Sequence, residues 1–233
     1  MTKTNKLIVN VLSICFILAA LLGVVHFCSF DINFYNKEHS KIMLYGKHIN
    51  EHIGITNSDL EELTVFTLDY LNDKESSLDK VLDIKGVDRE VYTADEKAHM
   101  VDVKNLNLAS IYIGIAAFVI FVLLTVIYFV NKGTISYLFY GYKKVLIYAL
   151  LFFAIIGFWI LIDFDTFWTT FHHIFFASND LWLLNLQTDV LIMIVPPEFF
   201  NHLVTKIVIV FVIVIIGFDL VLKLIDRRKT IDD

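Results

Sequence analysis

The sequence has few of the residues that form disulfides, tight turns and flexible linkers. It contains two Cys, two Pro and nine Gly among 233 residues. Cys15 and Cys28 fall in or beside one apolar run, and thirteen helical residues place them about 20 Å apart. A disulfide needs Cα atoms within about 7 Å, so these two cannot pair within one chain. The scarcity of Gly and Pro also argues against long flexible linkers.

Apolar residues make up 57% of the chain, and the mean hydropathy is +0.68. This is more apolar than an ordinary soluble domain. Four apolar runs approach the ~20 residues that cross a membrane as a helix, which satisfies its own backbone hydrogen bonds. They are Leu7–Phe27, Leu106–Val130, Val145–Ile162 and Leu203–Leu222. The pattern predicts an all-α integral membrane protein with four transmembrane helices and a small extracellular, mainly helical cap.

Basic residues alternate with these runs and predict the topology. Lysine and arginine gather before the first run, between the second and third, and after the fourth, whereas residues 163–202 contain none. The positive-inside rule therefore predicts a multi-pass membrane protein with both termini cytoplasmic. Residues 30–105 carry sixteen acidic and nine basic residues, so the excess negative charge of the chain, −6 in total, is predicted to lie outside the cell. This balance argues against nucleic acid as a partner and leaves membrane lipid around the spans.

The predicted segments follow from these two patterns. They are a cytoplasmic N-terminus with the first span (1–29), the extracellular cap (30–105), the second span (106–130), a cytoplasmic loop (131–144), the third span (145–162), an extracellular loop with an aromatic and histidine-rich stretch (163–202), and the fourth span with a cytoplasmic tail (203–233).

Two capping boxes predict helix starts in the cap. "SDLEEL" has Ser58 followed by Glu61 at the spacing at which each caps the other's backbone N–H. "TADE" repeats the pattern with Thr93 and Glu96. The second box begins a helix that can run through His99 and Asp102 into the second span.

The histidine doublet in "FHHIFF" predicts an asymmetric pair. At 100° per residue, Trp168, Phe171 and Phe175 share one helical face. His172 flanks that aromatic face, whereas His173 points nearly opposite. A histidine at a membrane edge can be an interfacial anchor, and the aromatic stripe can be an interface belt. Spacing alone leaves these structural roles open.

Two stretches resemble the signatures of the lipoprotein intramolecular transacylases, a family of bacterial four-span membrane proteins. They are "DEKAHMVDVKNL" (95–106) and "FHHIFFASNDLWLLNLQTDVLIMIVPPEFF" (171–200). The first contains a Glu-x-x-His-Met-x-Asp-Val-Lys pattern, and the second contains Phe-His-x-x-Phe-Phe, a Trp and Pro-x-x-Phe-Phe. The resemblance also covers the order of spans and cap along nearly the whole chain.

The resemblance implies an acyltransferase whose substrate is a diacylglyceryl lipoprotein. The sn-2 acyl chain moves to the α-amine of the N-terminal cysteine, which gives the lyso-form. His99 and His172 are the implied catalytic dyad at the outer leaflet, with their individual roles open. Aromatic residues would line the substrate pocket: Trp168, Phe171, Phe175, Phe176 and Trp182. Glu96 or Asp102 could orient His99, or both could be surface charges. Neither a metal nor a cofactor is needed.

Two other functions stay open on the residues alone. A metal-dependent membrane hydrolase could use the two histidines with a carboxylate from Asp102 or Asp189, because three N/O ligands and an open position make a workable zinc site. Against it, the sequence has no HExxH motif. A non-enzymatic membrane sensor or scaffold could instead bind a partner through the acidic cap.

Overall fold

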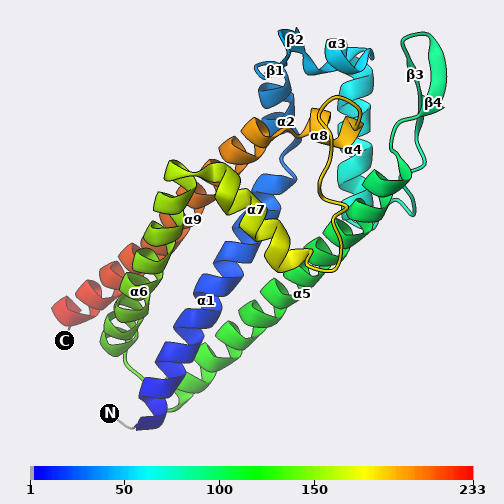
Figure 1. Ribbon diagram of the computed structural model, residues 1–233. Helices are drawn as coiled ribbons and strands as arrows, with labels where there is room; N and C mark the ends of the chain where they lie inside the picture. Colours follow the sequence, from blue (N-terminus) through cyan, green and yellow to red (C-terminus); the bar gives the residue numbers. More distant parts are fainter. Residues whose placement is uncertain (1–2, 233) are drawn as a thin grey trace. The chain divides into compact units, whose positions relative to one another are not determined.

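The computed structural model describes residues 3–232 and is dominated by long helices (Figure 1). The chain divides into two compact units. The first, called the span unit here, comprises Met1–His26, Ser110–Ile162 and Lys206–Asp233. The second, called the head unit, comprises Phe27–Ala109 and Asp163–Thr205.

Four helices are long and apolar enough to cross a membrane. They are α1 (Lys3–Ser29), α5 (Ala94–Val130), α6 (Ile135–Ile162) and α9 (Pro197–Asp232). The predicted all-α membrane fold with four spanning helices is confirmed. Their apolar side chains extend all round each helix, as expected where the surroundings are lipid.

Aromatic contacts hold the span unit together around α1. The Phe16 ring stacks on Phe218 of α9 at 4.0 Å and contacts Phe121 of α5 at 5.3 Å and Tyr142 of α6 at 5.8 Å. The Tyr142 hydroxyl donates to the Ile215 carbonyl at 2.8 Å. The Tyr142 hydroxyl is the one polar group among these four rings, and it has the hydrogen-bond acceptor that a buried hydroxyl needs.

Helix α6 begins at Ile135, inside the stretch predicted as the loop 131–144. The helix thus begins ten residues before the apolar run 145–162, and it continues through Lys143 and Lys144. Lysine is a good helix former, and its stem can pack on apolar neighbours. The Lys143 ammonium accordingly lies 5.7 Å from the centre of the Phe139 ring.

Helix α5 has 37 residues, which at about 1.5 Å per residue is about 55 Å long. The hydrocarbon core of a bilayer is only about 30 Å thick. The apolar part, residues 106–130, is long enough to span it. The preceding three turns therefore extend beyond the spanning segment, and they carry Glu96, His99 and Asp102.

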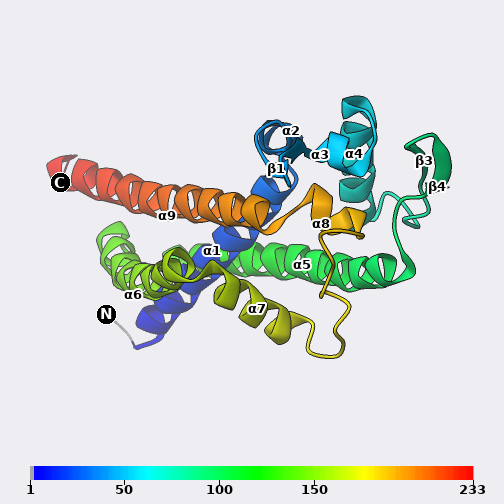
Figure 2. The ribbon, with the colours of Figure 1, turned by 45° about the horizontal axis from the view of Figure 1, so that its top comes forward.

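Short elements make up the rest of the head unit. They are α2 (Ile32–His39), α3 (Ile49–Ile53), α4 (Asn57–Leu71), α7 (Phe164–Phe175) and α8 (Val190–Ile194), with strands β1 (Met43–Leu44), β2 (Lys47–His48), β3 (Val81–Ile84) and β4 (Val87–Glu90). Helices α3 and α8 lie side by side (Figures 1 and 2). The unit buries apolar side chains from both of its segments, among them Ile49, Leu63 and Phe199.

One of the two predicted capping boxes is present. The Thr93 N–H donates to Glu96 Oε2 at 2.6 Å, the Glu96 N–H donates to Thr93 Oγ at 3.3 Å, and α5 begins at the next residue. The box predicted at Ser58 was wrong. Helix α4 is capped two residues earlier by Thr56 with Asp59, because Thr-x-x-Asp offers the same reciprocal bonds.

Two β-hairpins interrupt the helical cap that the sequence predicts. Strand β1 pairs with β2, and β3 pairs with β4, both antiparallel. Lys85 and Gly86 turn between β3 and β4 with φ of 59° and 84°. Positive φ at both central residues is the signature of a type I′ hairpin turn, for which Gly is favoured.

Candidate active site

The two predicted histidines lie together in the head unit. His99 is on α5 and His172 on α7, and their ring centroids are 6.2 Å apart. Their side chains are 6% and 7% exposed. Two buried imidazoles at this separation can act on one small group held between them.

Rings from α7 pack on the edges of His172. Trp168 lies 4.7 Å away at 73°, and Phe171 lies 5.6 Å away at 81°. Trp168 also packs on Phe200 at 4.3 Å. Phe175 is 51% exposed and packs on Phe171 at 4.7 Å. Of the three α7 rings expected to line the pocket, Trp168 and Phe171 therefore touch His172, while Phe175 is largely on the exposed side.

Two further predicted rings close the site. Phe176 is buried and lies edge-on to His99 at 5.2 Å, and it contacts His172 at 5.6 Å. Trp182, in the loop after α7, stacks on His172 at 4.9 Å and 28°. The imidazole pair is thus enclosed by aromatic side chains, which are typical of the lining of ligand sites.

A hydrogen bond within α7 determines the tautomer of His172. Its Nδ1 lies 2.8 Å from the Trp168 carbonyl. A carbonyl oxygen only accepts, so Nδ1 carries the proton and the lone pair of the neutral ring is on Nε2. Burial lowers the pKa of His172 below its ordinary value, outweighing this bond. The neutral ring with a free basic nitrogen is therefore the favoured form.

His173 differs from its neighbour, as the helical wheel predicts. It is exposed, and it meets Trp182 only edge-on, at 5.1 Å and 83°. One residue of sequence therefore separates a buried, oriented imidazole from an exposed one.

Glu96 holds a neighbouring segment. Its side chain is fully buried. One carboxylate oxygen accepts from the Thr93 N–H at 2.6 Å and the other from the Leu191 N–H at 2.7 Å. The carboxylate of Glu96 therefore bonds backbone N–H groups and not the His99 ring. Its carboxylate joins the first turn of α5 to α8.

Asp102 performs a similar task for the loop that carries Trp182. Its carboxylate accepts from the side-chain NH₂ group of Asn179 at 3.0 Å. The side-chain oxygen of Asn179 in turn accepts from the Leu181 N–H at 3.1 Å. Asp102 thus bonds the loop rather than the His99 ring. Asn179 was not predicted as part of the site. The sequence indicates only that polar residues, Asn179 among them, lie between "FHHIFF" and Trp182.

Two ring nitrogens in the site are buried without a hydrogen-bond partner in the described part of the chain. They are Nδ1 of His99 and Nε1 of Trp182. Buried polar atoms are normally paired. An unpaired nitrogen lone pair on His99 is the less costly case, since orphaned N–H groups are rarer than under-satisfied acceptors. The Trp182 nitrogen always carries a hydrogen.

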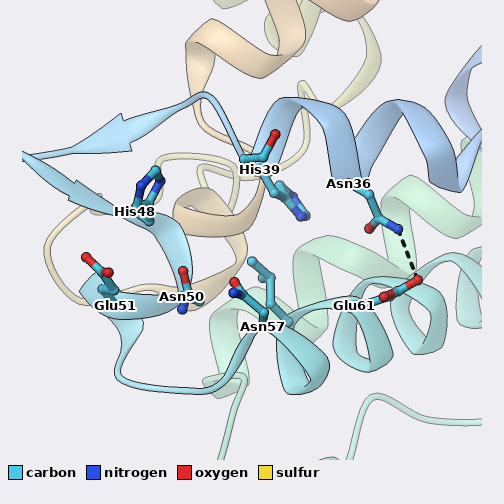
Figure 3. Close-up of a pocket in the computed structure, with 9 residues that line it drawn as sticks. Asn36, His39, His48, Asn50, Glu51, Asn57 and Glu61 are labelled. Atoms are coloured by element: carbon cyan, nitrogen blue, oxygen red, sulfur yellow. Dashed lines mark hydrogen bonds between the residues drawn. The ribbon is translucent and has the colours of Figure 1, made fainter.

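A hollow of about 480 Å³ lies between α2, α3 and α4 (Figure 3). Its lining is mainly polar: Asn36, His39, Ser40, His48, Asn50, Glu51, Asn57, Leu60 and Glu61. No predicted site residue contributes to it. The His39 Nε2–H donates to the Ile194 carbonyl at 3.0 Å, and burial lowers the pKa of His39. Helix α8 is therefore tied to Glu96 near its start and to His39 at its end.

The carboxylates that a metal site would need are engaged elsewhere. Asp102 bonds Asn179, and Asp189 accepts from the Asn185 N–H and the Thr188 hydroxyl, both at 2.7 Å. Within residues 3–232, no three His, Cys, Asp or Glu side chains are grouped so that they could hold a metal ion. This geometry gives the metal-dependent hydrolase no support.

Comparison with known proteins defines the class as membrane-integral acyltransferases. The sequence model of the lipoprotein intramolecular transacylase family, Lit, matches residues 10–200, and the chain belongs to this family. No curated protein sequence matches the chain significantly. Family membership overturns the sensor or scaffold interpretation.

Solved structures with the same fold come from Bacillus cereus. The membrane-integral lipoprotein intramolecular transacylase Lit of that organism has a TM-score of 0.75 and 19% identity, over 98% of this chain and 96% of that one. A variant of it with one histidine changed to alanine gives the same values. A variant with that histidine changed to arginine has a TM-score of 0.71, over 97% and 95% of the two chains.

Proposed function

We propose that this enzyme moves the sn-2 acyl chain of a diacylglyceryl lipoprotein onto the α-amine of its N-terminal cysteine. The amine nitrogen bonds to the ester carbonyl carbon, and the bond from that carbon to the glyceryl oxygen breaks. The amine loses a proton, and the glyceryl oxygen gains one. The products are an amide and a free hydroxyl on one molecule, the lyso-form lipoprotein.

His172 is the base in this proposal. An α-ammonium with a pKa of about 7.7–8.0 must first release a proton to solvent before it can attack. When the neutral amine bonds to the carbonyl carbon, its nitrogen must shed a second proton. The Nε2 lone pair of His172 accepts this proton, since Nδ1–H is bonded to Trp168. The same nitrogen then returns a proton to the glyceryl oxygen as the ester bond breaks.

His99 is the partner of His172 in the dyad. Its Nδ1 is buried and unpartnered within residues 3–232, which favours the tautomer with the proton on Nε2. That N–H can donate to the ester carbonyl and polarise it. The 6.2 Å between ring centroids leaves the ester and amine within reach of both imidazoles.

The enclosed aromatic site supports an intramolecular reaction. Attack passes through a ring of about eight atoms, which is an entropically poor closure that confinement assists. The rings of Phe176 and Trp182 border the imidazoles directly. The observation that carries the proposal is the buried His99–His172 pair inside this aromatic enclosure, in a chain of the transacylase family.

We further propose that both termini are cytoplasmic and that the head unit lies at the outer leaflet of the bacterial plasma membrane. The basic residues between the second and third spans, among them Lys143 and Lys144, support this orientation. Reporter fusions should place position 135 inside the cell and positions 75 and 180 outside. A cytoplasmic position 180 would contradict it.

The function is tested on the histidine doublet with a matched control. His172→Ala should lower the rate by about 10²–10⁴, as loss of a general base does, and His99→Ala should do the same. His173→Ala, the same change one residue away, should retain most activity because that ring is exposed.

Mass spectrometry of a reporter lipoprotein's N-terminal peptide, in cells expressing each variant, distinguishes the diacyl from the lyso-form. Immunoblotting confirms that each variant accumulates in the membrane. A requirement for His173 with a dispensable His172 would refute the assignment. Diacyl lipoprotein left unconverted by the unaltered enzyme would refute the reaction.

A further inference from the structure

We propose that the indole N–H of Trp182 is a catalytic hydrogen-bond donor. It would bind the ester oxygen that becomes negatively charged when the amine attacks. This inference rests on the proposed function and deepens it, since it gives a chemical task to a residue otherwise expected only to line the pocket.

The first support is the unpaired state of the indole nitrogen. Nε1 of Trp182 is buried and has no hydrogen-bond partner within residues 3–232. An indole N–H can only donate, and a buried donor left unpaired is destabilising. Such a group in a native fold calls for an explanation, and a ligand that supplies the acceptor is one.

The second support is the position of the ring. Trp182 stacks on His172 with ring centroids 4.9 Å apart and planes 28° apart. When the amine of a substrate reaches the lone pair of His172, the ester of the same molecule therefore lies close to the indole N–H of Trp182. The same ring meets His173 edge-on at 5.1 Å, so it contacts both members of the doublet.

The third support is the anchoring of the loop that presents Trp182. Asn179, three residues earlier, is bonded to Asp102 of α5 at 3.0 Å. Leu191, after the ring, donates its N–H to Glu96 of the same helix at 2.7 Å. An oxyanion donor is effective when it is already in position before the charge develops. The two carboxylates provide that preorganisation from the helix that also carries His99.

The donor would act in one defined step. As the amine nitrogen bonds to the carbonyl carbon, the π electrons of the C=O bond move onto oxygen and give a tetrahedral oxyanion. The indole N–H donates to this oxygen without transferring its proton. The attacking nitrogen gives its proton to His172. The oxyanion then re-forms the C=O bond and expels the glyceryl oxygen, which takes that proton from His172. Atoms and charge balance without a further reactant.

The test is Trp182→Phe, which keeps a stacked ring and removes the N–H. We expect kcat to fall by about 10²–10³, as for other oxyanion donors, with little change in KM. Trp159→Phe makes the same change on α6 in the span unit and should leave kcat unchanged.

Two non-reacting lipopeptides separate a catalytic donor from a packing role. In one, a phosphonate replaces the sn-2 ester and imitates the tetrahedral anion. In the other, an sn-2 ether imitates the ground state. Trp182→Phe should weaken phosphonate binding by the same factor as kcat and leave ether binding unchanged, since transition-state interactions are lost selectively. Retained ether binding also establishes that the variant is folded.

Equal losses for the phosphonate and the ether would overturn the inference, because they indicate a packing role. An unchanged kcat would overturn it as well. Both results leave the proposed function standing as long as the unaltered enzyme converts the diacyl lipopeptide in the same assay.

Discussion

The head unit and the span unit distribute polar groups in opposite ways. Apart from tyrosine, seven polar or charged side chains are buried among the described residues, and six of these belong to the head unit. The seventh, Ser13, bonds the Val9 carbonyl of its own helix. The span unit instead exposes large apolar side chains, such as Leu151 at 58% and Ile213 at 65%.

The difference indicates where specificity of structure is needed. A lipid-facing helix satisfies its backbone by itself, so packing within the span unit can be largely apolar. The head unit must fix short segments that are far apart in the sequence. It does so with polar contacts, among them the buried bond of Glu96 with Leu191 and the part-buried bond of the His202 imidazole with Glu38 at 2.6 Å. Such contacts are stabilising only while both partners remain.

The largest stability effect should come from breaking one of these contacts. Glu96→Ala removes the capping partner of Thr93 and leaves the Leu191 N–H buried without an acceptor. We expect the free energy of unfolding to fall by about 2–4 kcal/mol. Chemical denaturation in detergent micelles measures this value.

The matched control for that experiment lies one residue away. Asp95 is exposed in the same first turn of α5. Asp95→Ala removes only a favourable charge at the helix N-terminus, worth about 0.3–1 kcal/mol. Equal losses for Asp95→Ala and Glu96→Ala would contradict the role given to the buried carboxylate.

A smaller effect should appear in the titration of His172. Burial lowers its pKa below the ordinary 6.5, so the neutral base persists as the pH falls to that value and is lost only below it. Nitrogen NMR of labelled imidazoles, with His173 replaced by Ala, reports the midpoint directly. Phe176→Ala should admit water and raise the midpoint toward 6.5. A midpoint above 6.5 in the unaltered site would contradict the buried placement.

The smallest effect is expected on the lipid-facing surface. Ile213→Ala shortens a side chain that is 65% exposed, and should change the free energy of unfolding by less than about 0.5 kcal/mol. Ile215 on the same helix is fully buried, so Ile215→Ala should lower stability more by leaving a cavity. Thermal unfolding of the two variants in parallel makes the comparison. A greater loss for Ile213→Ala would mean that its exposed face is covered in the membrane by protein.

Local patterns in the sequence predicted much of the fold. The four spans follow from run length, and the start of α5 follows from Thr93 and Glu96. The α4 cap was misplaced because two overlapping Ser/Thr-x-x-acid patterns, at Thr56 and Ser58, compete within a few residues. The β3–β4 hairpin was missed because helical patterns dominate its flanks, although the Lys85-Gly86 turn signals it.

The contacts around the site were harder to predict because they join distant residues. The helical wheel predicts that His172 flanks the aromatic face and that His173 points away from it, since both lie on one helix. No periodicity indicates that the Asp102 carboxylate meets Asn179, or that Glu96 reaches Leu191. These bonds depend on how α5, α7 and α8 pack. The sequence therefore predicted that the two histidines lie near each other with most of the expected aromatic rings. It did not predict the hydrogen bonds that position these side chains.

The bond from His172 to the carbonyl of Trp168 makes this imidazole a one-ended proton carrier. The Nδ1 proton is retained by the ring's own helix, so exchange with a substrate is confined to Nε2. A proton accepted there must be released from the same atom. The amine that loses the proton and the glyceryl oxygen that receives it must therefore come to the same edge of one ring. A folded-back lipid-modified cysteine meets that requirement, because both atoms belong to a single residue.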